Sequence, residues 1–155
     1  MNQKKQIFEF EQAGDVLILV AHGPFMEFRD GDIRDGYNEA YRRLHEPDIR
    51  HLLVDFSKLE YFGSTFVGIL IRLAKKARSN QGEAALCHLS PSMADMLKTL
   101  MLLENTKTDF YWVPFENREA ALKALAEKEM IVRDDKYWIV YDVFFARWLE
   151  YHYGK

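Results

Sequence analysis

Several features that define protein classes are scarce or absent in the 155-residue chain. Its single cysteine, Cys87, excludes an intramolecular disulfide and favours a reducing compartment, the cytoplasm. Apolar runs such as residues 16–21 are far shorter than the about 20 residues of a helical membrane span. Glu9 and Glu11 interrupt the apolar segment that a secretory leader would need after the basic N-terminus. We therefore expect a cytoplasmic protein with no membrane span and no leader.

The chain also lacks an excess of positive charge. It has 21 Lys and Arg against 24 Asp and Glu, a formal net charge of -3 and a pI near 6.0. A nucleic-acid partner bound through its phosphates, or an anionic membrane surface, is therefore not expected. The length is typical of one domain that buries its own core without metals or disulfides.

Hydrophobic periodicity predicts strands that alternate with helices after an initial hairpin. The predicted strands are residues 7–11, 16–21, 51–56, 84–89 and 110–113, and the predicted helices are residues 32–44, 64–77, 91–101 and 120–128. This order indicates an α/β fold with a mixed four- to five-stranded sheet and helices packed on it. We assign residues 1–128 to this domain.

Residues 129–155 have a different composition and form a C-terminal extension rich in aromatic residues. Residues 130–132 and 138–141 could pair as a hairpin, and residues 143–153 could form a helix with one aromatic face. That face must be covered by the parent sheet, by a second subunit in a homodimer, or by a client protein.

No motif for catalysis, a cofactor or a metal is found. The five histidines are scattered, and there is neither a glycine-rich phosphate loop nor a Gly-x-Ser-x-Gly elbow. Strand alternation predicts that Cys87 and His88 point to opposite faces, so they are not expected to act as a pair. We therefore expect no enzyme activity, no cofactor and no metal ligands.

Asp30, Asp32 and Asp35 lie close together in the sequence and could bind a cation. Acidic residues at a helix N-terminus are stabilised by the helix dipole without any ligand. We favour this second interpretation.

Ser64 follows a buried strand and precedes an apolar helix. One hypothesis is that its hydroxyl only caps the helix, accepting a bond from a backbone N–H group. The other is that the hydroxyl is phosphorylated, which would place about two negative charges at a helix N-terminus and on any surface where a partner docks.

Residues 52–70 resemble the core of a STAS domain, the fold of bacterial anti-sigma factor antagonists. The resemblance rests on Val54, Asp55, Phe56, Ser57 and the apolar helix with its basic end at residues 68–78, and it extends over residues 5–128. It implies a mixed sheet with packed helices, in agreement with the periodicity.

The resemblance also implies a function. Ser64 occupies the phosphoacceptor position, with Thr65 beside it, and the implied partner is a serine kinase that is also the anti-sigma factor. Two positions depart from the family pattern: Gly63 stands where the family has Asp, and Phe66 where it has Gly.

The partner surface that the resemblance implies combines this turn with the loop after the second strand. The candidate contact residues are Phe25, Met26, Phe28, Phe62, Gly63, Phe66 and Val67. The loop aromatics could instead pack under the first helix as core residues.

The sequence thus indicates a non-catalytic signalling module that docks a partner near Ser64, with phosphorylation of Ser64 as the candidate switch. The alternatives are a constitutive scaffold subunit that assembles through its extension, or a STAS domain that binds a small ligand. Residues 141–149 also resemble the closing segment of winged-helix modules in some ATPases.

Overall fold

The computed structural model describes residues 6–23, 29–103 and 108–132, which form a single mixed sheet with helices on both faces. The strands are β1 (Phe8–Ala13), β2 (Val16–His22), β3 (His51–Lys58), β4 (Ala84–Cys87) and β5 (Val113–Phe115). The helices are α1 (Asp30–Leu44), α2 (Ser64–Ser79), α3 (Pro91–Thr99) and α4 (Arg118–Val132). The predicted fold class, a mixed four- to five-stranded sheet with packed helices, is confirmed, and the sheet has five strands.

The strand order in the sheet is the same as in the chain, β1-β2-β3-β4-β5. β1 and β2 form an antiparallel hairpin whose turn contains Gly14 at φ 60°, a left-handed conformation that suits glycine. The pairs β2–β3, β3–β4 and β4–β5 are parallel. The carboxyl ends of β2, β3 and β4 therefore meet at one edge, where ligand and partner sites of open α/β sheets are found.

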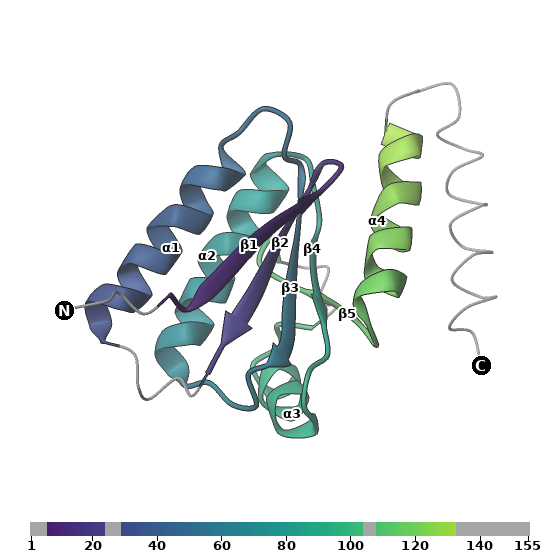
Figure 1. The fold of residues 1–155 in the computed structure, drawn as a ribbon. Coiled ribbons are helices and arrows are strands. Elements are labelled where there is room, and N and C mark those ends of the chain that lie inside the picture. Colours follow the sequence, from purple (N-terminus) through teal and green to yellow (C-terminus); the bar gives the residue numbers. More distant parts are fainter. Residues whose placement is uncertain (1–5, 24–28, 104–107, 133–155) are drawn as a thin grey trace.

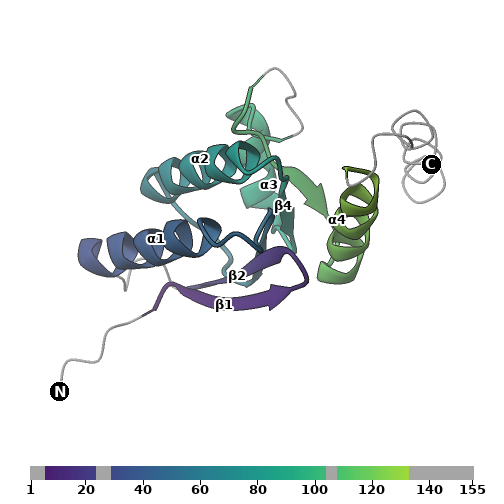
Figure 2. The ribbon, with the colours of Figure 1, turned by 90° about the horizontal axis from the view of Figure 1, so that it is seen from above.

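The two faces of the sheet are covered unequally. α1 and α2 lie side by side on one face, and α4 lies on the other (Figures 1 and 2). The first face contains the larger core, with Leu52, Val54 and Phe56 of β3 fully or almost fully buried. On the second face, Leu53 belongs to a smaller cluster with Leu125 of α4. Asp55 points to this second face, as strand alternation requires.

Gly82, just before β4, allows a close approach between two backbone segments. A Cβ atom added there would lie 1.8 Å from the carbonyl oxygen of Arg50. The β3–β4 region therefore closes only because this position has no side chain.

Two predictions differ from the structure by more than two residues at an end. The last strand begins at Val113 instead of residue 110, because Trp112 is buried and donates its N–H to the carbonyl of Leu102 before pairing with β4 starts. The strand predicted at residues 130–132 is wrong, since α4 continues to Val132. The rest of the predicted C-terminal extension lies outside the described residues.

Candidate functional site

The turn between β3 and α2 holds the predicted phosphoacceptor. Gly63 is the N-cap of α2, with extended backbone (φ -102°, ψ -171°), and its carbonyl accepts bonds from the N–H groups of Phe66 and Val67. Ser64 is the first residue inside the helix, and α2 has no side-chain cap. The hypothesis that the Ser64 hydroxyl caps the helix is therefore wrong, because glycine occupies the capping position one residue earlier.

The side chains of Ser64 and Thr65 are exposed, and the first turn of α2 contains no acidic residue. The positive end of the helix dipole at this turn is thus not compensated by a carboxylate on its own helix. A negative charge placed on either hydroxyl would be stabilised there.

A groove of about 360 Å³ runs between α1 and α2 and includes this turn. It is lined by Asp30, Ile33, Arg34, Tyr37, Ser64, Thr65, Gly68, Ile69 and Arg72. The Arg72 guanidinium lies 5.7 Å from the centre of the Tyr37 ring. Burial raises the pKa of the Tyr37 hydroxyl, against the opposing charge of Arg72. The groove that includes the candidate phosphoacceptor thus combines apolar walls with the charged residues Asp30, Arg34 and Arg72.

At the entrance to α1, the acidic residues act as the helix-dipole interpretation predicts. Asp30 and Asp32 lie in the first turn of α1, and Oδ2 of Asp32 accepts the backbone N–H of Arg29 at 3.0 Å. This arrangement stabilises the helix without a cation.

The aromatic residues of the turn lie beneath the surface. Phe62 is 0% exposed and Phe66 is 1% exposed, and their ring centres are 5.0 Å apart. Phe56 stacks on Phe62 at 5.5 Å, and Phe8 meets Phe66 edge-on at 5.8 Å. Val67 is also buried. The prediction of an exposed contact surface is corrected for these three residues: they support the turn from inside the core.

The remaining predicted contact residues divide into two groups. Gly63 is half-buried at the turn. Phe25, Met26 and Phe28 lie outside the described residues. The structure therefore brings Gly63, Ser64 and Thr65 together at one accessible position.

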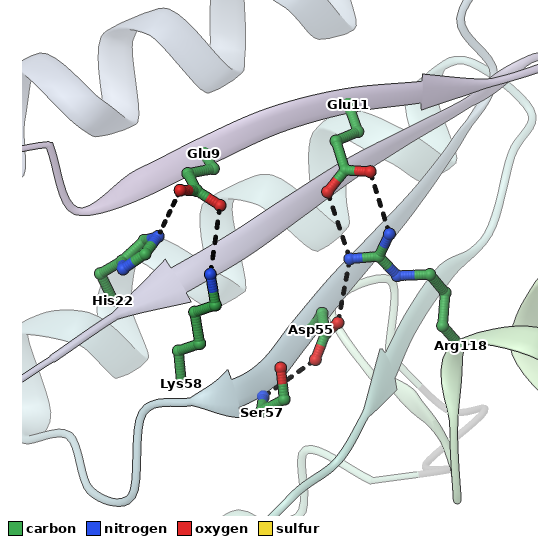
Figure 3. A network of polar contacts seen from close by, with 7 residues as sticks. All are labelled: Glu9, Glu11, His22, Asp55, Ser57, Lys58 and Arg118. Carbon is green, nitrogen blue, oxygen red and sulfur yellow. Dashed lines mark hydrogen bonds and ion pairs between the residues drawn. The ribbon is translucent and has the colours of Figure 1, made fainter.

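A second group of polar residues lies on the α4 face, near the carboxyl end of β3 (Figure 3). Asp55 is 5% exposed; its Oδ1 accepts the Ser57 N–H at 2.9 Å, and its Oδ2 accepts Nη2 of Arg118 at 3.0 Å. The same guanidinium contacts both carboxylate oxygens of Glu11, at 3.0 and 3.3 Å. Arg118, the first residue of α4, thus connects this helix to β1 and β3.

Opposing effects set the pKa of the Asp55 carboxyl. Burial raises it, but hydrogen bonds from Ser57 and Arg118 and the charge of His88 lower it further, so the net pKa lies below its ordinary value. The carboxylate is therefore ionised at neutral pH.

Glu9 forms a neighbouring contact on the same face (Figure 3). Its carboxylate lies 3.2 Å from Nε2 of His22 and 3.7 Å from Nζ of Lys58. β1, β2 and the end of β3 thus present polar side chains on this face.

Cys87 and His88 approach Asp55 from the end of β4. The strand stops at Cys87, and His88 has a positive φ of 60°, which ends the alternation of side chains. One potential ligand atom from each of Asp55, Cys87 and His88 lies within 4.8 Å of the other two. The prediction that Cys87 and His88 face apart is therefore wrong. Burial raises the pKa of the Cys87 thiol to about 12, with Asp55 adding to the effect.

Sequence reasoning missed this polar cluster. Asp55 carried one signal, a carboxylate inside an otherwise apolar strand. Nothing in the sequence near Arg118 or Glu11 pointed to the pairing, because 63 residues separate Arg118 from Asp55 and 107 separate it from Glu11.

Two family models match the chain. The model of the STAS domain matches residues 8–120, which include the turn, the groove and the Asp55 cluster. The model of a probable winged helix domain matches residues 117–151. The second match begins at the N-terminus of α4 and includes residues 141–149, whose winged-helix resemblance the sequence indicated; beyond Val132 it lies outside the described residues.

Three solved structures share the fold. An anti-sigma-factor antagonist (STAS) domain protein from Planctomyces limnophilus is 21% identical, with a TM-score of 0.61, over 77% of this chain and 97% of that chain. The Bacillus cell fate determinant SpoIIAA in its phosphorylated form is 14% identical, with a TM-score of 0.57, over 75% and 96%. The anti-sigma factor antagonist SpoIIAA in its unphosphorylated form is 14% identical, with a TM-score of 0.59, over 74% and 92%.

Among the described residues, no helix has the length and apolar character needed to cross a membrane.

Proposed function

The chain belongs to the STAS domain family, and on that premise we propose that it is a non-catalytic signalling module that binds a partner protein at the N-terminus of α2 and is switched by phosphorylation of Ser64. The proposed partner is a serine kinase that is also an anti-sigma factor. We place this action in transcription control in the bacterial cytoplasm.

The observation that carries the proposal is the state of the Ser64 hydroxyl. It is exposed in the first turn of α2, while Gly63 takes the capping position. A serine that served only as a cap would stand one residue earlier, with its hydroxyl bonded to the backbone. Ser64 is therefore accessible to a kinase without loss of a helix cap.

The electrostatic setting supports a switch. A phosphate carries about -1.5 to -2 charge at neutral pH. On Ser64 it would lie at the N-terminus of α2, whose first turn has no acidic residue, and in the groove that contains Arg34 and Arg72 together with Asp30. The folded domain tolerates that charge, whereas a partner that docks on the same surface with its own acidic or apolar groups would be displaced.

The structural neighbours agree with this role. One of them is an anti-sigma factor antagonist, and that protein has been solved in phosphorylated and unphosphorylated forms. The same kind of switch is part of our proposal for this chain.

The experiment is a phosphorylation assay with serine kinases encoded near this gene, followed by mass spectrometry to locate the phosphate. We expect modification of the wild type and of Thr65→Ala, and none of Ser64→Ala. Thr65 is the matched control because it is the neighbouring exposed hydroxyl. Phosphate found only at sites other than Ser64 would contradict the proposal.

A second candidate function is a constitutive scaffold, in which the C-terminal segment, matched at residues 117–151 by the model of a probable winged helix domain, has a role of its own. In this alternative the extension mediates assembly, for example as a homodimer, and Ser64 stays unmodified. Light scattering on the full chain and on a chain ending at Val132 distinguishes the two. A dimer that becomes a monomer on truncation supports the scaffold, and a monomer in both cases argues against it.

A further inference from the structure

Three residues with different metal-binding groups meet at the carboxyl ends of β3 and β4. Asp55 and Cys87 are register partners on these neighbouring parallel strands, so their side chains point to the same face. His88 follows directly, and its positive φ turns the chain so that a ring nitrogen comes within 4.8 Å of the other two ligand atoms.

This combination of ligands matches the chemistry of zinc. Thiolate sulfur, imidazole nitrogen and carboxylate oxygen are the three protein ligand types of Zn²⁺, at bond lengths of about 2.0–2.3 Å. Tetrahedral coordination at these lengths separates the ligand atoms by about 3.3–3.8 Å. His88 is exposed, so rotation of its side chain can close the remaining distance.

The groups around the cluster hold one ligand in place. Asp55 accepts the Ser57 N–H through one oxygen and Arg118 through the other, which fixes the plane of the carboxylate. Ligating carboxylates are commonly oriented by such outer partners. Each carboxylate oxygen keeps a second lone pair for a metal.

The local charges also balance. The guanidinium of Arg118 is paired with Glu11 as well as with Asp55. With that positive charge neutralised by Glu11, Zn²⁺ would be matched by the two negative ligands, the Asp55 carboxylate and the Cys87 thiolate. The proton that Cys87 loses on binding passes to the buffer.

From these observations we propose that Asp55, Cys87 and His88 form a Zn²⁺ site with three protein ligands and a fourth position left for a water or an external ligand. Three protein ligands and one open position are typical of sites that bind an exchangeable water or an external ligand. The site lies on the α4 face, whereas the Ser64 groove lies between α1 and α2 on the other face. The two proposals therefore stand independently.

The test uses the full-length protein, freed of metal with a chelator and titrated with CoCl₂ as a spectroscopic probe for zinc. Thiolate coordination gives a sulfur-to-cobalt charge-transfer band in the near ultraviolet. We expect this band to saturate at about one cobalt per chain and to disappear when ZnCl₂ is added.

Variants locate the site. Cys87→Ser and His88→Asn remove one ligand each, and asparagine is chosen because it tolerates positive φ. His45→Asn is the matched control, since His45 is an exposed histidine at the end of α1. We expect Cys87→Ser to lose the band. His88→Asn should bind cobalt with more than about tenfold lower affinity, and His45→Asn should match the wild type.

Circular dichroism verifies that each variant is folded, and His88→Asn keeps the test valid if Cys87→Ser does not fold. Absence of the band in the wild type would overturn the proposal. Cobalt binding that is as strong in Cys87→Ser and His88→Asn as in the wild type would place the metal elsewhere and overturn the proposal as well.

Discussion

Nη2 of Arg118, the first residue of α4, lies 3.0 Å from Oδ2 of Asp55 in β3. α4 is the helix that covers the second face of the sheet in the described structure, and this contact fixes its N-terminus to the carboxyl end of the sheet. Because Asp55 is almost fully buried, the pairing matters for stability. The first two predictions test it.

Arg118→Gln is expected to lower the free energy of unfolding by about 1–3 kcal/mol, because Asp55 loses a charged donor while it stays buried. Urea denaturation followed by circular dichroism measures the change. Arg42→Gln is the control: Arg42 pairs with Glu39 on the solvent side of α1, and its loss is expected to cost less than about 0.5 kcal/mol. Equal effects of the two substitutions would contradict a special role for Arg118.

The stability supplied by Asp55 is expected to depend on pH. Its pKa is lower in the folded chain than the unfolded value of about 3.9, so the ionised form stabilises the protein above that value. This contribution is lost as the pH falls through the folded pKa. The stability difference between wild type and Asp55→Asn should therefore shrink on acidification below about pH 4.

Urea denaturation at a series of pH values measures this difference. The same comparison in the Arg118→Gln background should shrink less, because one of the groups that lower the pKa has been removed. A stability difference that grows on acidification would show that the sign is wrong.

Phe66→Ala is expected to destabilise the chain by about 3–5 kcal/mol, since a fully buried ring is replaced by a cavity among Phe8, Phe56 and Phe62. Tyr61→Ala serves as the control in the same turn. Tyr61 is 63% exposed, and its loss is expected to change stability by less than about 0.5 kcal/mol. A Phe66→Ala protein as stable as the wild type would mean that the ring does not support the turn.

Two glycines are expected to respond in opposite directions to alanine. Gly82→Ala forces a Cβ atom against the Arg50 carbonyl and should destabilise by more than about 2 kcal/mol. Gly68→Ala meets no atom within 4 Å inside α2 and should stabilise by about 0.5–1 kcal/mol. Thermal unfolding of both variants measures the contrast, and a stable Gly82→Ala protein would contradict the close approach.

Gly63→Asp is expected to stabilise α2, because a carboxylate at the N-cap accepts a first-turn N–H and compensates the dipole. The backbone at Gly63 has negative φ and leaves open space for a Cβ atom, so no strain opposes the change. Gly63→Ala is the matched control without a cap. In urea denaturation, the free energy of unfolding of Gly63→Asp should exceed that of Gly63→Ala by about 1 kcal/mol. Equal stability of the two variants would contradict the capping role.

The sequence predicted those elements whose pattern is local. The continuous apolar runs of β2, β3 and β4 and the stripes of α1 and α2 were placed within a few residues of their ends. Positions that depend on the backbone conformation at the end of a helix or strand are harder to predict. The sequence suggests Ser64 as the N-cap of its helix, whereas the structure has Gly63 there, because the extended conformation of Gly63 cannot be read from the residue types. His88 was assigned to the wrong face, because its positive φ ends the alternation.

The burial of Phe62 and Phe66 was hidden for a related reason. Phe62 lies in the loop before α2, where residues are normally exposed, and Phe66 lies in the first turn of α2, but both rings join the core with Phe56. Arg118 could not be paired with Asp55 from the sequence, because only the position of α4 on the sheet brings the two together. Long-range contacts of this kind depend on the packed structure.

The place of β1 in the strand order restricts how copies of this chain can meet. β1 is an edge strand, and it carries the exposed carboxylates of Glu9 and Glu11. If two chains joined their sheets through this edge in an antiparallel manner, these acidic side chains would approach each other and repel. Glu9 is paired within the chain with His22 and Lys58, and Glu11 with Arg118, so joining two sheets at the β1 edge would also disturb these contacts. The β1 edge is therefore disfavoured as a dimer surface, and the same charges oppose growth of the sheet into aggregates.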